Sequence, residues 1–231
     1  MQTEPIYQLI AVGLGPGDPD LISVKGLSAL QSADEIFYPA SKLQANKIQS
    51  HSLQILNHYN LNAKLSPFHT PMTGIDRELF YMEAWKKIKA SLTQSKKVAV
   101  VSEGDLLFYS TFGYILELAK KDQFKCKLIP GITAFANSAS EAQIPIVEGN
   151  RPFKVIARPE SFEEIEKELA KNQSLVIMKI KSLNGWFEFL NKTDRSFIYA
   201  EKTGTNEQFI TSDIKELENH SIPYFSLIIF N

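Results

Sequence analysis

The sequence lacks the features that mark secreted, membrane-spanning and nucleic-acid-binding proteins. Its single cysteine cannot close an internal disulfide, and the apolar-leaning residues around Cys126 favour a buried structural thiol. The 25 Lys and Arg residues nearly balance the 26 Asp and Glu residues, so no overall positive field attracts nucleic acid. No apolar run approaches the roughly 18 residues of a spanning helix, and no secretory signal stands at the N-terminus. We therefore expect a cytoplasmic protein with no nucleic-acid or membrane partner.

What is present is the composition of an ordinary folded protein. Hydrophobic residues make up 44% of the chain and charged residues 22%, which excludes long disorder and fibrous repeats. The 231 residues exceed the usual domain size of roughly 100–200 residues. We expect two α/β domains, one over residues 1–125 with a glycine-rich first loop and one over residues 126–231. No Gly/Ser-rich linker or charge run marks the boundary between them.

Strand and helix patterns alternate along the first domain. Residues 6–12 predict a buried strand, and the continuously apolar residues 98–101 are typical of a central parallel strand. Further strands are expected at 35–38, stopped by Pro39, and at 126–129, with helices near 24–30 (capped by Ser23), 42–58, 76–92 and 112–119. This order predicts a largely parallel sheet, in which ligands bind beyond the carboxyl ends of the strands.

The alternation restarts after Pro145 and predicts a second α/β domain with a mixed sheet. Strands are expected at 153–157, 174–178, 196–201, 207–211 and 224–230, and helices at 161–171 and 183–191.

The glycine-rich turn at residues 13–18 does not identify a ligand by itself, since tight turns between strand and helix often use glycine. A dinucleotide-binding turn would open straight into a helix, but Pro16 lies inside this turn and the next helix starts several residues later. No Gly-Lys-Ser/Thr follows, which also disfavours a phosphate-binding P-loop. What remains is a turn without side chains at Gly13, Gly15 and Gly17, either a plain tight turn or a place where a ligand approaches the backbone.

Three strand-end segments, taken in order and spacing, resemble the tetrapyrrole methylase family. They are GLGPGDP at 13–19, SEGDLLFYST at 102–111 and IPGITA at 129–134. Further matches at 34–39, 144–149, 176–179 and 223–227 extend the resemblance over nearly the whole chain. Within the family, the segments 37–39, 71–73, 103–111 and 224–226 are similar to the precorrin-2 or cobalt-factor-II C20-methyltransferases.

The resemblance implies a fold, a cofactor and a reaction. The fold is two α/β domains with S-adenosylmethionine in the cleft between them, usually in a homodimer. The reaction is methylation of carbon 20 of precorrin-2 or cobalt-factor II in cobalamin biosynthesis. The cofactor contacts carried over by motif are Pro16, Glu103, Gly104, Asp105, Phe108, Thr133, Ala134, Met178 and Gly204.

One residue departs from the family pattern. The family usually has proline after Gly-Asp, whereas this chain has Leu106. Proline would fix φ and remove an N–H, so we expect leucine to loosen the turn or add a donor while cofactor binding survives.

The expected chemistry needs positioning more than reactive side chains. Methyl transfer from a sulfonium is an in-line displacement, and orientation supplies much of its rate. The four histidines share no zinc-type spacing, and we expect no metal. A carboxylate-rich tetrapyrrole calls for cations, and Lys179 and Arg77 are candidates, although such residues are otherwise solvated surface charges.

The remaining candidates for substrate contact and proton transfer lie in the first two loops. Gly13 and Gly15 are candidate substrate contacts by backbone. Glu103 and Tyr109 are candidate general bases for the proton lost from carbon 20, with loop hydrogen bonding and packing as their alternative roles. We expect Gly15→Val to abolish cofactor binding with the fold largely intact.

Other functions stay open at this stage. Within the same fold they are methylation elsewhere on a corrin precursor, on uroporphyrinogen or on ribosomal RNA, the last disfavoured by the balanced charge. A non-catalytic tetrapyrrole- or cofactor-binding module is the alternative from another class.

Overall fold

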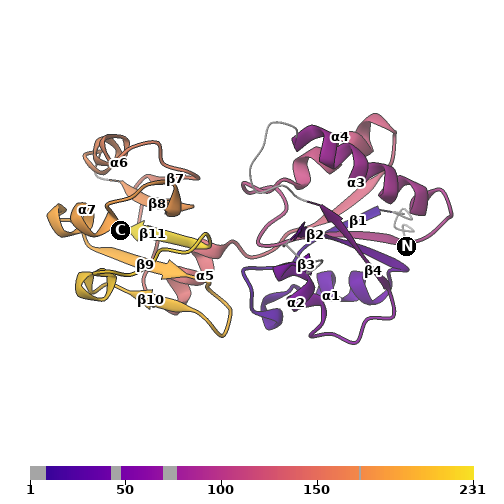
Figure 1. Cartoon of the computed structure of the whole chain (residues 1–231), viewed down its shortest axis with the longest axis horizontal. Coiled ribbons are helices and arrows are strands. Elements are labelled where there is room, and N and C mark those ends of the chain that lie inside the picture. Colours follow the sequence, from indigo (N-terminus) through magenta and orange to yellow (C-terminus); the bar gives the residue numbers. More distant parts are fainter. Residues whose placement is uncertain (1–8, 43–47, 70–76, 172) are drawn as a thin grey trace. The chain divides into compact units, whose positions relative to one another are not determined.

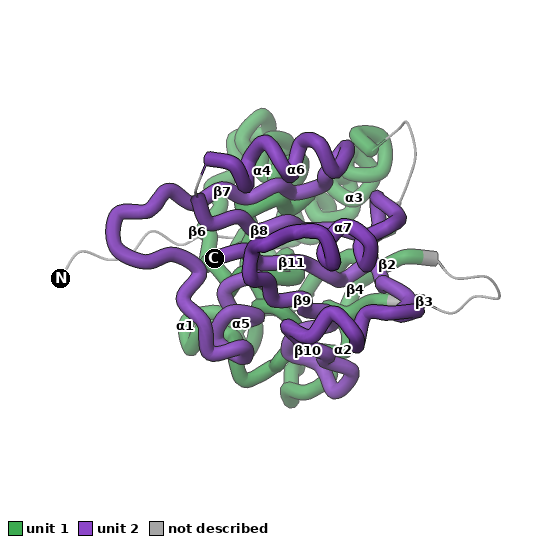
Figure 2. Tube along the Cα trace, turned by 90° about the vertical axis from the view of Figure 1, so that its left-hand side faces the viewer, with its two compact units in different colours: residues 1–133 green, residues 134–231 purple. Residues whose placement is uncertain are grey.

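The computed structural model describes residues 9–42, 48–69, 77–171 and 173–231 (Figure 1). It divides into two compact units, residues 1–133 and 134–231, coloured green and purple in Figure 2. Within the described ranges, no helix combines the length and the apolar character needed to cross a membrane. The motif segment at 71–73 lies outside the described residues.

The first unit is built on a parallel sheet, as the sequence predicts. Strand β2 (Glu35–Lys42) lies between β4 (Lys64–His69) and β5 (Val98–Ser102), and β1 (Leu9–Gly13) lies between β5 and β6 (Cys126–Ile129). All these pairs are parallel, while the short β3 (Ile48–Gln49) pairs antiparallel with the end of β2. The carboxyl ends of β1, β5 and β6 therefore meet at one edge of the sheet.

Helices cover both faces of this sheet, which explains the uninterrupted apolar run in β5. Val98 and Val100 pack in the core under α3 (Arg77–Leu92) and α4 (Phe112–Lys121). Ala99 and Val101 pack in the opposite core, under α1 (Val24–Gln31) and α2 (His51–Leu56). Successive strand residues point to opposite faces, so both sets must be apolar. The two pairs of helices lie on opposite sides of the sheet in Figure 1.

The sequence predicted the start of the first helix correctly but the end of the second strand wrongly. Ser23 caps α1, its Oγ accepting the Gly26 N–H at 3.1 Å, as predicted. The strand expected to stop at Pro39 instead continues to Lys42, and the Pro39 carbonyl accepts the Ser50 hydroxyl at 2.6 Å. The helix expected over 42–58 is wrong at its start: Lys42 pairs with Ile48 between strands, and the helix observed there is α2. Strand β4 had no counterpart in the sequence prediction.

The division between the units follows β6. Sequence reasoning placed residues 126–133 in the second domain, but β6 pairs with β1 and completes the first sheet. Cys126, on this strand, is partly exposed, and burial raises the pKa of its thiol to about 11. The thiol is therefore protonated at neutral pH.

The second unit holds a mixed sheet, again as predicted. Its strands are ordered β10 (Phe209–Thr211), β9 (Phe197–Glu201), β11 (Ser226–Phe230), β8 (Ser174–Met178) and β7 (Phe153–Ile156). Only the β7–β8 pair is parallel. The fully buried β11 runs antiparallel to both β8 and β9, so those two strands end at the same edge of the sheet.

Helices and short 3-10 turns cover this second sheet. One face packs against α6 (Phe162–Leu169) and α7 (Trp186–Lys192), and the other packs against α5 (Ala134–Glu141). The 3-10 turns among the described residues are η1 (Pro19–Leu21) in the first unit and η3 (Ile180–Ser182) and η4 (Ile214–Leu217) in the second.

Candidate functional site

The loops that follow β1 and β5 are hydrogen-bonded to each other in the first unit. The Leu14 N–H donates to the Ser102 carbonyl at 2.9 Å. Gly15 and Gly104 exchange two backbone bonds, at 3.2 Å and 2.7 Å. Both glycines have positive φ, +84° and +65°, a conformation that other residues adopt only with strain. The glycines therefore fix how these loops leave the sheet.

Gly13 and Gly131 allow the third loop, after β6, to pack directly on the other two. A Cβ at Gly13 would lie 2.5 Å from the Gly131 nitrogen, and a Cβ at Gly131 would lie 2.1 Å from the Gly104 carbonyl oxygen. Neighbouring backbone thus fills the space that a side chain at Gly13 would take, and substrate contact at Gly13 stays a prediction. The sequence placed Gly131 in the motif at 129–134 but indicated no role for it, because the close approach joins segments far apart in the chain.

The side-chain directions of Gly15 and Gly104 differ from these. A Cβ at Gly15 would point at η1, 3.5 Å from the Leu21 carbonyl oxygen. The positive φ would strain a valine at this position. We therefore expect Gly15→Val to destabilise the fold, whereas the sequence had led us to expect the fold to stay largely intact. A Cβ at Gly104 would meet nothing nearer than the Ile132 carbonyl oxygen at 4.0 Å. The Cα of Gly104 is therefore open on the side where a side chain would lie, while its N–H and carbonyl are bonded to Gly15.

Asp105 holds the second and third loops together. Its Oδ1 accepts the N–H groups of Leu107 at 2.9 Å and Phe108 at 3.1 Å. Its Oδ2 accepts the Gly131 N–H at 3.1 Å. A carboxylate that accepts three backbone N–H groups organises the loop strongly. Direct cofactor contact by Asp105 stays a prediction beside this structural role.

Glu103, a candidate base, is engaged by α2. Its Oε1 accepts the Ser52 N–H at 3.0 Å and the Ser52 hydroxyl at 2.5 Å. Ser52 lies in the first turn of α2, where unpaired N–H groups favour an acidic partner. Glu103 therefore forms loop hydrogen bonds, which is the alternative role considered for it, and a role as general base stays a prediction.

The second loop sends one leucine inward and two apolar side chains outward. Leu106 is 1% exposed and packs in the core beside Phe112. Leu107 is 63% exposed and Tyr109 is 51% exposed, with a strained φ of +52° at Tyr109. Leu106 therefore anchors the turn in the core, and the expectation that leucine loosens the turn relative to proline or adds a donor stays a prediction. Leu107 and Tyr109 are thus exposed apolar side chains on the same loop as Gly104.

Arg77 lies at the start of α3, close to these loops. One turn on, the buried Tyr81 is hydrogen-bonded to Thr111. Burial raises the pKa of Tyr81, while the Thr111 hydrogen bond and the nearby charge of Arg77 lower it. Arg77 is exposed, so its guanidinium is available to an anionic group near the strand ends.

The remaining first-unit candidates lie in the same three loops. Each loop contributes one half-buried residue: Pro16 in the first, Phe108 in the second and Thr133 in the third. The Phe108 ring packs edge-to-face with the Tyr109 ring, with 4.9 Å between the ring centroids.

The second-unit candidates gather at the common end of β8 and β9. Met178 ends β8, opposite Leu227, and Lys179 follows with a φ of +53° and donates its N–H to the Ser226 carbonyl at 3.2 Å. Gly204, with a φ of +81°, lies in the loop after β9. Ala134 is the first residue of α5. The structure thus brings Met178, Lys179 and Gly204 to one edge of this sheet.

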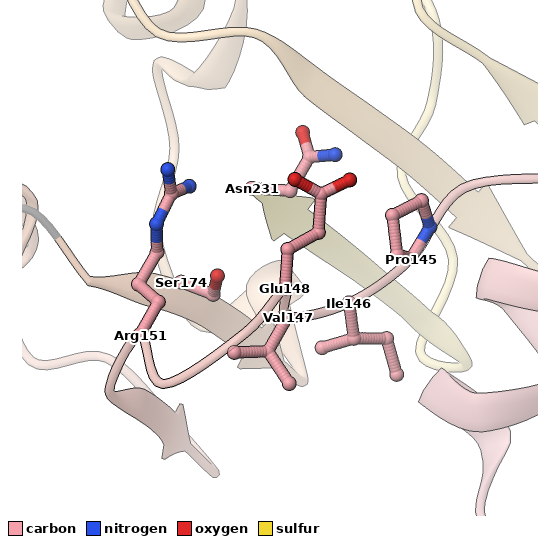
Figure 3. A pocket seen from close by; sticks show the side chains of 7 residues that line it. All are labelled: Pro145, Ile146, Val147, Glu148, Arg151, Ser174 and Asn231. Carbon is pink, nitrogen blue, oxygen red and sulfur yellow. The ribbon is translucent and has the colours of Figure 1, made fainter.

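The pocket in Figure 3 is a separate feature of the second unit. It has a volume of about 110 Å³ and is lined by residues 145–148, Arg151, Ser174 and Asn231. None of the predicted site residues lines it.

Residues 8–218 match the family model of the tetrapyrrole (corrin/porphyrin) methylases. The chain belongs to this family. The match confirms the resemblance drawn from the strand-end motifs, and the tetrapyrrole methylase described here is an S-adenosylmethionine-dependent C-methyltransferase.

This methylase is similar to two curated relatives over nearly its whole length. It is 30% identical to the precorrin-2 C(20)-methyltransferase of Sinorhizobium sp., over 97% of this chain and 95% of the relative. It is 28% identical to the probable cobalt-precorrin-2 C(20)-methyltransferase of Methanocaldococcus jannaschii, over 97% and 96%. The solved structure of a cobalt precorrin-4 methyltransferase has a TM-score of 0.74 at 21% identity, covering 99% of this chain and 98% of that one. That likeness shows the shared fold.

The loops of the first unit fit S-adenosylmethionine. Gly104 leaves its Cα open where a side chain would lie, and Leu107 and Ile132, which is 38% exposed, present apolar side chains of the kind that line ligand sites. Backbone carbonyls suit a sulfonium cation. When bound, the cofactor supplies the electrophilic methyl group, and the loops supply its orientation.

Proposed function

We propose that this methylase transfers a methyl group to carbon 20 of precorrin-2 or cobalt-factor II (cobalt-precorrin-2) in cobalamin biosynthesis. The observation that carries the proposal is the pair of relatives named as C(20)-methyltransferases, which match it over at least 95% of both chains. The motif segments at 37–39, 103–111 and 224–226 support the same branch. We also propose that it works as a homodimer, which the family resemblance implies, and that it is located in the cytoplasm.

The proposed mechanism relies on a rigid frame around the reacting groups. The Gly15–Gly104 bonds and the Asp105 bridge hold the first-unit loops before any ligand binds. A fixed frame lowers the entropy cost of aligning the methyl group with the attacking carbon. Apolar Leu107 and Tyr109 offer a surface on which part of a flat macrocycle packs, and Arg77 and Lys179 pair with its carboxylates.

The proton released from carbon 20 leaves without a dedicated enzyme base in this proposal. Glu103 already accepts two hydrogen bonds through Oε1 from Ser52, so this oxygen is engaged in holding the second loop to α2. Water or a substrate carboxylate takes the proton instead.

A methyl-transfer assay tests the function directly. The protein is incubated with methyl-labelled S-adenosylmethionine and either precorrin-2 or its cobalt complex, and the product is examined by mass spectrometry and NMR. We expect one added methyl group on carbon 20. A methyl group at another carbon would overturn the position, and cofactor binding without transfer to any tetrapyrrole would favour the non-catalytic module.

A further inference from the structure

In the loop between β9 and β10, the backbone N–H of Gly204 is hydrogen-bonded within the loop itself. The Gly204 N–H donates to the Oε1 of Gln208 at 2.8 Å. Positive φ angles at Lys202 (+47°) and Gly204 (+81°) shape this loop. Gly204 therefore offers a ligand its carbonyl group and its bare Cα.

Helix α5 holds this loop at two points. The Gln208 Nε2 donates to the Oε2 of Glu141 at 3.1 Å, at the last residue of α5. One turn earlier, the buried hydroxyls of Ser138 and Thr203 are hydrogen-bonded at 2.8 Å. Ser138 and Glu141 are three residues apart and so share one face of the helix. Gln208 thus connects the backbone of Gly204 to that face.

The same helix begins at another expected cofactor contact. Ala134 is the first residue of α5 and Glu141 is the last, a span of roughly 10 Å at 1.5 Å per residue. A rigid helix therefore sets the separation between Ala134 and the loop that carries Gly204, provided that Gln208 stays bonded to both Gly204 and Glu141.

We propose that Gln208 is a positioning residue for S-adenosylmethionine. Through Glu141 it fixes the Gly204 backbone relative to Ala134, so that the loop is ordered before the cofactor arrives. The inference rests on the proposed function, since it takes Ala134 and Gly204 as cofactor contacts. Losing the bridge leaves a loop that must be ordered on binding, which weakens affinity without altering the reacting groups.

The first test compares two variants of this loop. Gln208→Leu removes both hydrogen bonds of the side chain and is expected to weaken binding of S-adenosylhomocysteine about five- to tenfold by calorimetry, the effect of one or two ordinary hydrogen bonds. The KM for S-adenosylmethionine rises by the same factor, while kcat at saturating cofactor and the KM for the tetrapyrrole stay near wild type. Asn206→Ala, at an exposed position of the same loop, is the matched control and leaves all these values unchanged.

The second test exchanges the bridging partners. Gln208→Glu is expected to weaken cofactor binding, because it places two carboxylates together and removes the donor to Glu141. Glu141→Gln keeps an oxygen that accepts the Gln208 Nε2–H and is expected to have the smaller effect. The double variant restores cofactor binding to within about twofold, since a carboxylate at 208 still accepts the Gly204 N–H while an amide at 141 donates to it. A role confined to stability would lower Tm in the variants without this rescue of affinity.

The outcomes separate the inference from the function beneath it. Wild-type protein that binds cofactor and methylates its substrate, together with Gln208→Leu at unchanged affinity, overturns the role of Gln208 alone. The same holds if the exchanged pair binds cofactor no better than Gln208→Glu alone. Wild-type protein that fails to bind S-adenosylhomocysteine overturns the proposed function and the role of Gln208 together.

Discussion

The carboxylate of Asp105 accepts the backbone N–H of Gly131 at 3.1 Å and thereby joins the loops after β5 and β6. The other oxygen of this carboxylate shapes its own loop through two further N–H groups. One side chain thus organises two of the three loops to which the cofactor contacts of the first unit are assigned.

We expect Asp105→Ala to remove all three hydrogen bonds, lower the free energy of unfolding by about 2–4 kcal/mol and weaken S-adenosylhomocysteine binding at least tenfold. Asp105→Asn keeps an oxygen that accepts the N–H groups of Leu107 and Phe108, but its amide NH2 cannot accept the Gly131 N–H. We expect its free energy of unfolding to lie between those of wild type and Asp105→Ala. Urea denaturation and calorimetry measure both effects. Wild-type stability in Asp105→Ala would refute the role assigned to this carboxylate.

The two kinds of loop glycine should respond differently to alanine. In Gly131→Ala the new Cβ would overlap the Gly104 carbonyl oxygen, and we expect a loss of at least about 3 kcal/mol or no folded protein. In Gly104→Ala the Cβ enters open space, and the positive φ costs about 1 kcal/mol. We therefore expect Gly104→Ala to fold but to bind cofactor more weakly than wild type, because the new methyl group enters the space open to a ligand. Thermal unfolding and calorimetry distinguish the two, and equal Tm values would contradict the packing described for Gly131.

Leu106 offers a test of how the second loop is anchored. Its side chain is 1% exposed in the core of the first unit, so Leu106→Ala should lower the free energy of unfolding by about 2–5 kcal/mol. Leu107→Ala, on the neighbouring exposed residue, is the matched control and should change stability by less than about 0.5 kcal/mol. Similar losses in both variants would show that the loop is not anchored through Leu106.

Glu35 should make the stability of the protein depend on acidic pH. Burial raises the pKa of its carboxyl group, but hydrogen bonds from Ser66, Ser91 and Lys64 outweigh burial and lower the pKa to about 2. The charged form is thus favoured in the folded state, and its contribution is complete above the unfolded pKa of 4.5 and is lost as pH falls toward 2.

The expected loss over that interval is about 3 kcal/mol from this one group. Urea unfolding of wild type and Glu35→Gln at pH 6, 4 and 3 measures it. The variant should be less stable than wild type at pH 6, and the difference should shrink as the pH falls. A difference that stays constant with pH would remove Glu35 as the cause.

Local patterns in the sequence were enough to predict a parallel sheet, a mixed sheet and the family. Continuous apolar runs such as 98–101 and the restart of alternation after Pro145 depend on neighbours in the chain, and both reappear as β5 and as the second unit. The strand-end motifs are also local, so their order and spacing were enough to indicate the family to which the chain belongs.

The hydrogen-bond partners of individual side chains are visible only in the tertiary structure. Asp105 reaches Gly131, Glu103 reaches Ser52 and Gln208 reaches Glu141, each across a gap in sequence that no local pattern encodes. The end of the first unit was likewise decided by the pairing of β6 with β1. Periodicity records which face of an element is buried, whereas hydrogen bonds between distant loops depend on where the whole chain brings them together.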